Sequence, residues 1–92
     1  MKTASDYLNE ADSIMKQRAA LRDSSEGERS MITAVNAFNI LTGHSLTETE
    51  GWQFMLILKQ ARAKNGDYHE DDYCDVVAYS SLMAEAANKE NT

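Results

Sequence analysis

The chain has 92 residues, enough for one domain, and its formal net charge of −6 disfavours nucleic acid as a partner because a phosphate backbone repels an acidic surface. Cys74 is the only cysteine, which excludes a disulfide within the chain, and a finger-type zinc site lacks the ligands that it needs. No apolar run approaches the roughly 18 residues that span a membrane, and the first residues lack a signal-peptide pattern, so we expect a cytoplasmic protein.

The short chain implies a small core. A domain of this size buries only about 60% of the surface that its unfolded chain exposes, so small domains often add a disulfide, a metal or a second subunit. The composition offers neither a disulfide nor a zinc site, so oligomerisation is the remaining way to stabilise this small domain. We therefore expect a dimer or a higher oligomer. Proline is absent and only four residues are glycine, which favours helices along the whole chain.

The first predicted helix covers residues 5–21, where apolar side chains recur at intervals of three and four residues. Ser5 is the expected N-cap, and Asp6 lies at the positive end of the helix dipole. The stripe expected to face the core consists of Tyr7, Leu8, Ala11, Ile14, Met15, Arg18 and Leu21.

The second predicted helix covers residues 26–42. Ser25 and Glu28 have the S-x-x-E spacing of a capping box, and Gly43 is a typical C-terminal stop. The stripe expected to be buried consists of Met31, Ala34, Val35, Phe38 and Leu41.

The third predicted helix covers residues 48–64. Thr47 and Glu50 form a second capping box, and Gly66 ends the element. The helix is apolar around much of its circumference, which is typical of a helix that is covered on two sides. Its large apolar side chains are Trp52, Phe54, Met55, Leu56, Ile57 and Leu58. Phe54, Leu56 and Trp52 are therefore the predicted interface with a second copy of the chain.

The fourth predicted helix covers residues 69–87, with acidic residues in its first turns and frayed residues 88–92 after it. Its expected inner face consists of Tyr73, Val76, Val77, Ser80, Leu82 and Met83. We predict an all-α, four-helix domain over residues 1–92, in which the third and fourth helices form an antiparallel hairpin and an oligomer completes the core.

Asp71, Asp72 and Asp75 share one face of the fourth helix, because positions three and four residues apart are neighbours. Paired carboxylates can hold magnesium. They can equally complement the helix dipole or pair with Lys59 and Arg62 across the predicted hairpin.

Lys59 and Arg62 lie on one face of the third helix and could bind a phosphate, with Arg18 adding to the site. Solvated or ion-paired charges are the competing interpretation. Four aromatic residues could stack on a base or anchor a partner, and Tyr68 is the one expected to be most exposed; they are Trp52, Tyr68, Tyr73 and Tyr79. The sequence contains no catalytic triad order, no Gly-rich phosphate loop and no metal-ligand cluster, so no catalytic residue is assigned.

Several strings taken together resemble a family of small uncharacterised proteins encoded in bacteriophage and prophage genomes. The strings are Gly27-Glu28-Arg29-Ser30-Met31, Val35-Asn36-Ala37-Phe38-Asn39, Leu46-Thr47-Glu48-Thr49-Glu50-Gly51-Trp52-Gln53-Phe54-Met55, Leu58-Lys59-Gln60-Ala61-Arg62, Asp71-Asp72-Tyr73-Cys74-Asp75 and Ala78-Tyr79. This resemblance covers roughly residues 18–86 and implies a phage setting rather than an activity.

A more distant resemblance is to the all-helical MazG-like nucleotide pyrophosphohydrolases. Those enzymes carry a Glu-x-x-Glu pair on one helix and a Glu-x-x-Asp pair on the next, which together hold magnesium against a nucleoside triphosphate. The second pair has a counterpart in Asp72 and Asp75, but the third helix presents Lys59 and Arg62 where the first pair is expected. The resemblance thus implies nucleotide binding, while two bases in place of two acids would repel magnesium and attract phosphate.

We therefore predict a phage-encoded, non-catalytic binding protein that sequesters a ligand, such as a nucleotide, or blocks a host factor, a host defence component being one candidate. The alternative is a magnesium-dependent, MazG-like nucleotide pyrophosphohydrolase. No cofactor is expected for the first function, and magnesium only for the second. The expected partners are a second copy of the chain and a host protein or small phosphorylated ligand in the host cytoplasm, with no nucleic acid and no membrane.

Overall fold

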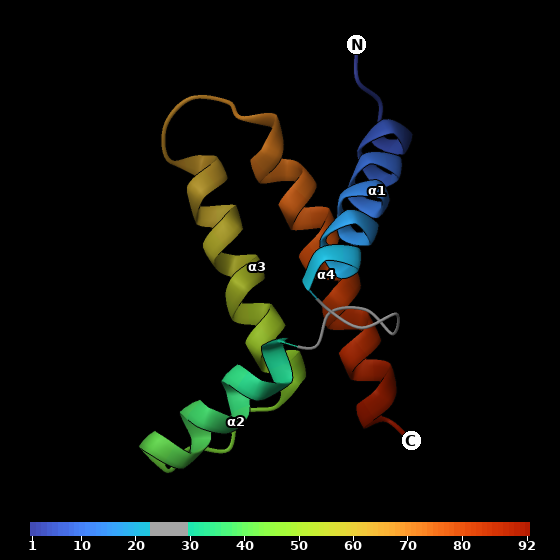
Figure 1. The fold of residues 1–92 in the computed structure, drawn as a ribbon. Coiled ribbons are helices and arrows are strands. Elements are labelled where there is room, and N and C mark those ends of the chain that lie inside the picture. Colours follow the sequence, from blue (N-terminus) through green and yellow to red (C-terminus); the bar gives the residue numbers. More distant parts are fainter. Residues whose placement is uncertain (23–29) are drawn as a thin grey trace.

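The computed structural model describes residues 1–22 and 30–92, and over these residues it contains four helices and no strand (Figure 1). The helices are α1 (Ala4–Arg22), α2 (Ser30–Thr42), α3 (Glu48–Lys64) and α4 (Glu70–Glu90). The predicted all-α fold is confirmed. The Ser25–Glu28 capping box, and with it the predicted start of the second helix at residue 26, lies outside the described residues.

The third helix begins and ends where the sequence predicted. The Thr47 hydroxyl accepts a hydrogen bond from the backbone N–H of Glu50 at 3.1 Å, and the Glu50 carboxylate accepts one from the Thr47 N–H at 2.9 Å. This is the predicted capping box, which satisfies donors that the first turn of a helix leaves unpaired. Beyond the other end, Gly66 adopts a φ of 101°, which a residue with a side chain rarely reaches.

Helix α1 begins differently from the prediction. Thr3, not Ser5, occupies the capping position: its hydroxyl accepts from the Asp6 N–H at 3.2 Å, and its own N–H donates to the Asp6 carboxylate at 2.9 Å. Ser5 lies inside the helix. Hydrogen bonding to the backbone N–H and to the hydroxyl of Thr3 holds the pKa of Asp6 below its usual value, because it stabilises the ionised carboxylate. The predicted N-cap at Ser5 is therefore wrong, because the cap lies two residues earlier in the chain.

Helices α3 and α4 form the predicted antiparallel hairpin, and α1 lies across α4 on another side (Figure 1). Trp52 is only 4% exposed and stacks on Tyr79 of α4, with ring centroids 5.5 Å apart. Small residues on α4 allow both neighbours to approach closely. The buried positions on α4 are Cys74, Ala78 and Ala86. Helix α4 is therefore the central element of the described structure.

The C-terminal turn of α4 is ordered rather than frayed, contrary to the prediction. Glu90 is the last residue of α4, and its carboxylate accepts hydrogen bonds from the backbone N–H and hydroxyl of Thr49 at 3.2 and 2.5 Å. Thr49 lies in the first turn of α3, where a negative charge complements the helix dipole. A contact between distant parts of the hairpin therefore extends α4 by three residues beyond the predicted end at residue 87.

Helix α2 packs against α3 alone among the described elements. The contact depends on Gly51 of α3, because a Cβ atom there would lie 2.6 Å from Met31 Sδ and 2.7 Å from Val35 Cγ2. Of the predicted buried stripe, Val35 is buried and Met31 is half-buried, whereas three members are exposed. Those three are Ala34, Phe38 and Leu41. The prediction was wrong for them because α2 has one neighbouring helix, not two, in the described part of the chain.

The predicted inner faces of α1 and α4 are also only partly covered. Ala11 is buried on α1, but Leu8 and Leu21 are exposed, and Tyr73 on α4 is exposed as well. These corrections have the same cause, since α1 contacts α4 and no other described helix. Within the described ranges, no helix combines the length and apolar character that crossing a membrane requires.

Candidate functional site

Three helices meet at the carboxylate of Asp75. Lys59 Nζ on α3 lies 3.0 Å from Asp75 Oδ2, and the two side chains are only 14% and 17% exposed. On the other side, Arg18 Nη1 of α1 lies 4.0 Å from Asp75 Oδ1, with the arginine side chain largely in solvent. Lys59 Nζ also lies 6.0 Å from the ring centroid of Tyr79, within range of a cation–π contact. Asp75 thus links α4 to both of its neighbours.

In the described structure, two of the predicted phosphate-binding residues contact a carboxylate of the same chain. Lys59 and Arg18 come together, but they do so around Asp75, as the ion-paired interpretation of Lys59 predicted. Arg62 lies one turn further along α3 and is exposed. A phosphate at this place would have to compete with Asp75 for the ammonium group of Lys59.

The acidic residues of α4 do not converge on one point. Asp75 is paired with Lys59, Asp71 is exposed, and Asp72 is half-buried with its backbone N–H bonded to the His69 carbonyl at 3.1 Å. Among residues 1–22 and 30–92, no three His, Cys, Asp or Glu side chains are placed as the ligands of a metal ion would be. Glu70, Asp71 and Asp72 lie in the first turn of α4, where they complement the helix dipole.

A small cleft of about 380 Å³ lies between α1 and α4 beside the Arg18–Asp75 contact. Its lining consists of Ile14, Gln17, Arg18, Leu21, Asp71, Cys74 and Asp75. Cys74 is buried, and burial raises the pKa of its thiol. The nearby acids Glu70, Asp71 and Asp75 raise that pKa further, while Lys2 opposes them. The thiol is therefore kept protonated and a poor nucleophile.

A larger groove of about 590 Å³ lies between the N-terminal turns of α1 and α4, and we call it the tyrosine groove. It is lined by Ala4, Tyr7, Leu8, Tyr68, Tyr73, Val76 and Val77. The rings of Tyr68 and Tyr73 stack with centroids 5.6 Å apart and an interplanar angle of 22°. The hydroxyls of Tyr7 and Tyr68 hydrogen-bond to each other across 61 positions of sequence. That bond raises the pKa of Tyr68 to about 12.

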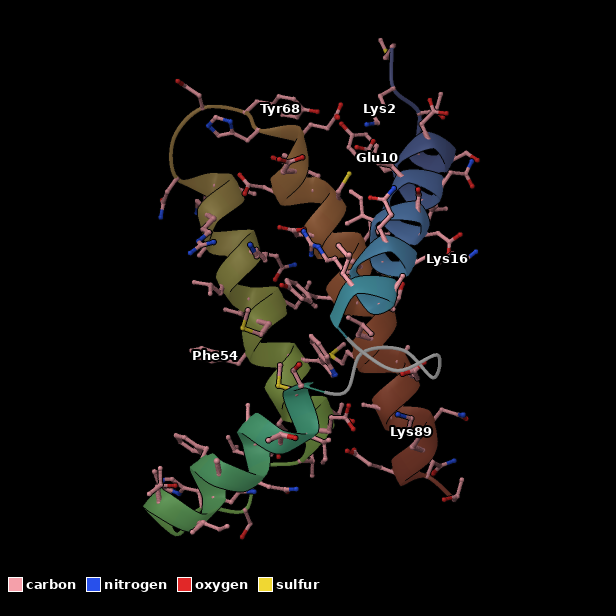
Figure 2. The ribbon with its side chains drawn as sticks, viewed as in Figure 1. Lys2, Glu10, Lys16, Phe54, Tyr68 and Lys89 are labelled. Carbon is pink, nitrogen blue, oxygen red and sulfur yellow. The ribbon has the colours of Figure 1, made fainter. Side chains whose placement is uncertain are left out.

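Charged side chains stand at one end of the tyrosine groove. Lys2 pairs with Glu10 and with Glu70, the latter at 2.8 Å, and its ammonium lies 5.0 Å from the ring centroid of Tyr7 (Figure 2). The bond to Glu70 raises the pKa of Lys2 and keeps it protonated. One cation and two carboxylates leave this end with a net negative charge. The groove therefore favours neutral or cationic ligands over anions.

Residues 6–87 match a family whose description is domain of unknown function, DUF6378. The chain belongs to this family. No curated protein and no solved structure shows a significant similarity to it. The DUF6378 region contains all three tyrosines of the groove and the Lys59–Asp75 pair, whereas Lys2 precedes its first residue.

Sequence reasoning identified part of this DUF6378 site. Tyr68 was expected to be the most exposed aromatic residue available to a ligand, and it is exposed. Tyr7 was assigned to the core stripe of the first helix, and nothing in the sequence signals that it meets Tyr68. The two meet because α1 and α4 begin at the same end of the molecule, an arrangement set by how α1 crosses α4 (Figure 1).

Proposed function

We propose that this DUF6378 protein is a non-catalytic binding protein that takes up a planar aromatic ligand in the tyrosine groove. The proposal rests on the three tyrosine side chains that line a concave surface of about 590 Å³. Ligand sites commonly have volumes of about 300–1,000 Å³ and are mainly apolar and aromatic, with a few polar groups that orient the ligand. Here the hydroxyls of Tyr7 and Tyr68 are such groups.

A nucleobase is the ligand that fits this lining best. Stacking of a base on an aromatic side chain contributes about 1–3 kcal/mol and tolerates different bases, because every base has a flat π-face. Tyr68 and Tyr73 are already stacked and exposed, so they offer such a face without rearrangement of the core. This continues the prediction that the aromatic residues could stack on a base.

The charges at the end of the groove favour a nucleoside over a nucleotide as the ligand. Glu10 and Glu70 outnumber Lys2 at the end of the groove, and phosphates placed there would be repelled. At the predicted phosphate site, Lys59 is paired with Asp75. We therefore propose a base or nucleoside as the primary ligand, and a nucleotide as the weaker one.

The competing proposal is the magnesium-dependent pyrophosphohydrolase. It needs carboxylates free to coordinate magnesium, and the Lys59–Asp75 pair supports the binding protein over the hydrolase, since Lys59 competes for Asp75. Release of pyrophosphate from nucleoside triphosphates with magnesium tests this directly. Turnover that disappears in both Asp72→Asn and Asp75→Asn would reverse the order of the two proposals.

For the biological setting, we propose a phage-encoded protein that acts in the host cytoplasm, where it sequesters its ligand or blocks a host factor. The resemblance of the sequence to phage and prophage proteins supports this. Mass spectrometry of small molecules retained by protein purified from infected cells would identify a sequestered ligand. A host protein recovered in place of a small molecule would favour the blocking role.

Titration calorimetry with the common nucleobases, nucleosides and nucleoside triphosphates tests the ligand site. We expect nucleosides to bind more tightly than the triphosphates, and Tyr68→Ala or Tyr73→Ala to weaken binding at least tenfold. Tyr68→Phe keeps the ring and should retain most of the affinity. Lys16→Ala, on the exposed surface of α1, is the control that should bind as the wild type does. Binding that is unaffected by both alanine variants, or no binding to any compound, would contradict the proposal.

A further inference from the structure

Helix α2 and the segment that follows it project from the other three helices (Figure 1). We call residues 30–46 the α2 arm. The arm is ordered by its own contacts: the Asn39 side chain bonds the backbone N–H and carbonyl of Leu46, both at 2.9 Å, and the rings of Phe38 and His44 stack. Its only packing against another described helix is the contact of α2 with α3.

The composition of the arm differs from that of the rest of the chain. Residues 30–46 include no Asp, Glu, Lys or Arg, although these make up 26% of the sequence. Ile40 and Leu41 are 83% and 85% exposed. The other large apolar side chains that the arm exposes are Ile32, Phe38 and Leu46. A helix with one face in solvent normally carries charges on that face, so this pattern is typical of a helix that is covered on both sides.

The arm is also a helix that needs cover to be stable. Helix α2 has 13 residues, and isolated helices shorter than about 12–15 residues are marginal in water. Among the described residues, it packs against another helix only along the side of Met31 and Val35, against Gly51 of α3. Further packing on its other side would supply the missing stabilisation.

The chain exposes more surface than a compact monomer of its mass. The chain exposes 6592 Å², whereas a compact monomer of its 10.3 kDa mass exposes about 5,350 Å², which leaves an excess of roughly 1,200 Å². Its radius of gyration of 14.3 Å likewise exceeds the roughly 12 Å of a compact chain of this length. A standard interface buries about 800 Å² on each partner, which is less than this excess.

The distribution of charge indicates which partner fits. Two copies with a net charge of −6 each repel one another over most of their surfaces. Residues 30–46 contain no Asp, Glu, Lys or Arg, so copies can meet at the α2 arm with less of that repulsion. Phe54, one turn beyond Gly51 on α3, is 69% exposed and points outward in Figure 2, which extends the apolar surface from the arm onto α3.

We propose that two copies of the chain pair through their α2 arms, with Ile40 and Leu41 of each copy buried against the apolar surface of the other and Phe54 at the edge of the contact. This closed two-fold pairing covers the same patch on both chains. It differs in location from the interface predicted from sequence, because Trp52 is buried within its own chain and Leu56 is half-buried, which leaves Phe54 alone of the three fully accessible. The pairing does not depend on the tyrosine groove, so either proposal can fail without the other.

Light scattering coupled to size-exclusion chromatography at micromolar concentration tests the pairing. The wild-type chain should have twice the 10.3 kDa mass of one copy, and the double variant Ile40→Glu/Leu41→Glu should be a monomer. Leu21→Glu, at an equally exposed leucine on α1, is the matched control and should remain a dimer. A wild-type monomer with full helix content, or a dimer that Leu21→Glu dissociates and the arm variant does not, would overturn the proposal.

A cross-linking measurement covers the case in which the charged arm variant does not fold. In a Cys74→Ser background, Leu41→Cys should form an intermolecular disulfide on mild oxidation, because the two-fold pairing brings the arms together. Leu21→Cys in the same background should cross-link much more slowly. Equal rates for the two cysteines would mean that the arms do not meet, and would also overturn the proposal.

Discussion

The ammonium group of Lys59 on α3 lies 3.0 Å from the carboxylate of Asp75 on α4, and both side chains are mostly shielded from solvent. Removing one charge leaves the other without its partner, so we expect Asp75→Asn to lower the free energy of unfolding by about 1–3 kcal/mol. Lys59→Met should cost less, because Arg18 remains 4.0 Å from Asp75 and still compensates its charge. Urea unfolding followed by circular dichroism measures both.

An exposed ion pair provides the control for these variants. Lys16 and Asp12 are also 3.0 Å apart, but on the solvent side of α1. Water screens such a pair, so Lys16→Met should leave the melting temperature almost unchanged. If Asp75→Asn were as harmless as Lys16→Met, the Lys59–Asp75 pair would contribute nothing to holding α3 against α4.

The features that the sequence predicted correctly depend on residues close together in the chain or joined by a short connection. The capping box of Thr47 and Glu50 involves residues three positions apart, and the Lys59–Asp75 pair follows once α3 and α4 form a hairpin. The end of α4 was missed because it depends on Thr49, 41 positions away from Glu90.

For a related reason, the sequence alone could not predict the tyrosine groove or the exposed surface of the α2 arm. An apolar stripe shows that a helix face avoids water, but not which surface covers it. The sequence predicts a buried stripe that contains Phe38 and Leu41, although in the described structure these two side chains are exposed. The tyrosine groove depends on how α1 crosses α4, and no pattern within either helix fixes that crossing.

The hydrogen bond between Tyr7 and Tyr68 predicts an unusual titration. The pKa of Tyr68 is raised to about 12, so the folded chain favours the neutral phenol more than the unfolded chain does. The stabilisation is fully present below the ordinary tyrosine pKa of about 10 and is lost as the pH rises through 12. In Tyr7→Phe the pKa of Tyr68 should fall towards its ordinary value, because the bond to Tyr7 is the largest cause of the shift.

Absorbance of tyrosinate near 295 nm measures this titration. One of the four tyrosines of the wild type should ionise last, and that late component should disappear in both Tyr7→Phe and Tyr68→Phe. Far-ultraviolet circular dichroism at each pH establishes that the chain is still folded. A late component that persists in Tyr68→Phe would assign the raised pKa to another residue.

The capping box of α3 predicts a local loss of stability. Thr47→Ala removes the hydroxyl that accepts the Glu50 N–H and should lower the free energy of unfolding by about 0.5–2 kcal/mol. Ser13→Ala, at an exposed interior position of α1, removes a similar hydroxyl without a cap and should be nearly neutral. An unchanged melting midpoint for Thr47→Ala would mean that Glu90, through Thr49, is enough to hold this end of the helix.

The change in stability caused by Gly51→Ala distinguishes packing from helix propensity. Close packing predicts a loss of stability, whereas helix propensity predicts a gain. Alanine is a better helix former than glycine by about 1 kcal/mol, so on propensity alone Gly51→Ala would stabilise α3. The new methyl group, however, would lie 2.7 Å from Val35 Cγ2 and 2.6 Å from Met31 Sδ. The thioether of Met31 can move aside, but the valine methyl is fixed close to the backbone of α2. Overpacking of this kind costs about 1–3 kcal/mol, and we therefore expect a net loss of stability in chemical unfolding.

A second-site change identifies the cause of that loss. Val35→Ala removes the methyl group that Gly51→Ala would strike, so the glycine substitution should cost less in the Val35→Ala background than in the wild type. Gln53→Ala, on the exposed side of the same helix, changes the helix propensity without adding a packing contact. It should be neutral or slightly stabilising. If Gly51→Ala stabilised the chain as much as Gln53→Ala does, α2 would not rest on Gly51 in solution. The α2 arm would then have no fixed position from which to pair with a second copy. This substitution therefore also tests the packing of α2 on α3, on which the proposed dimer contact depends.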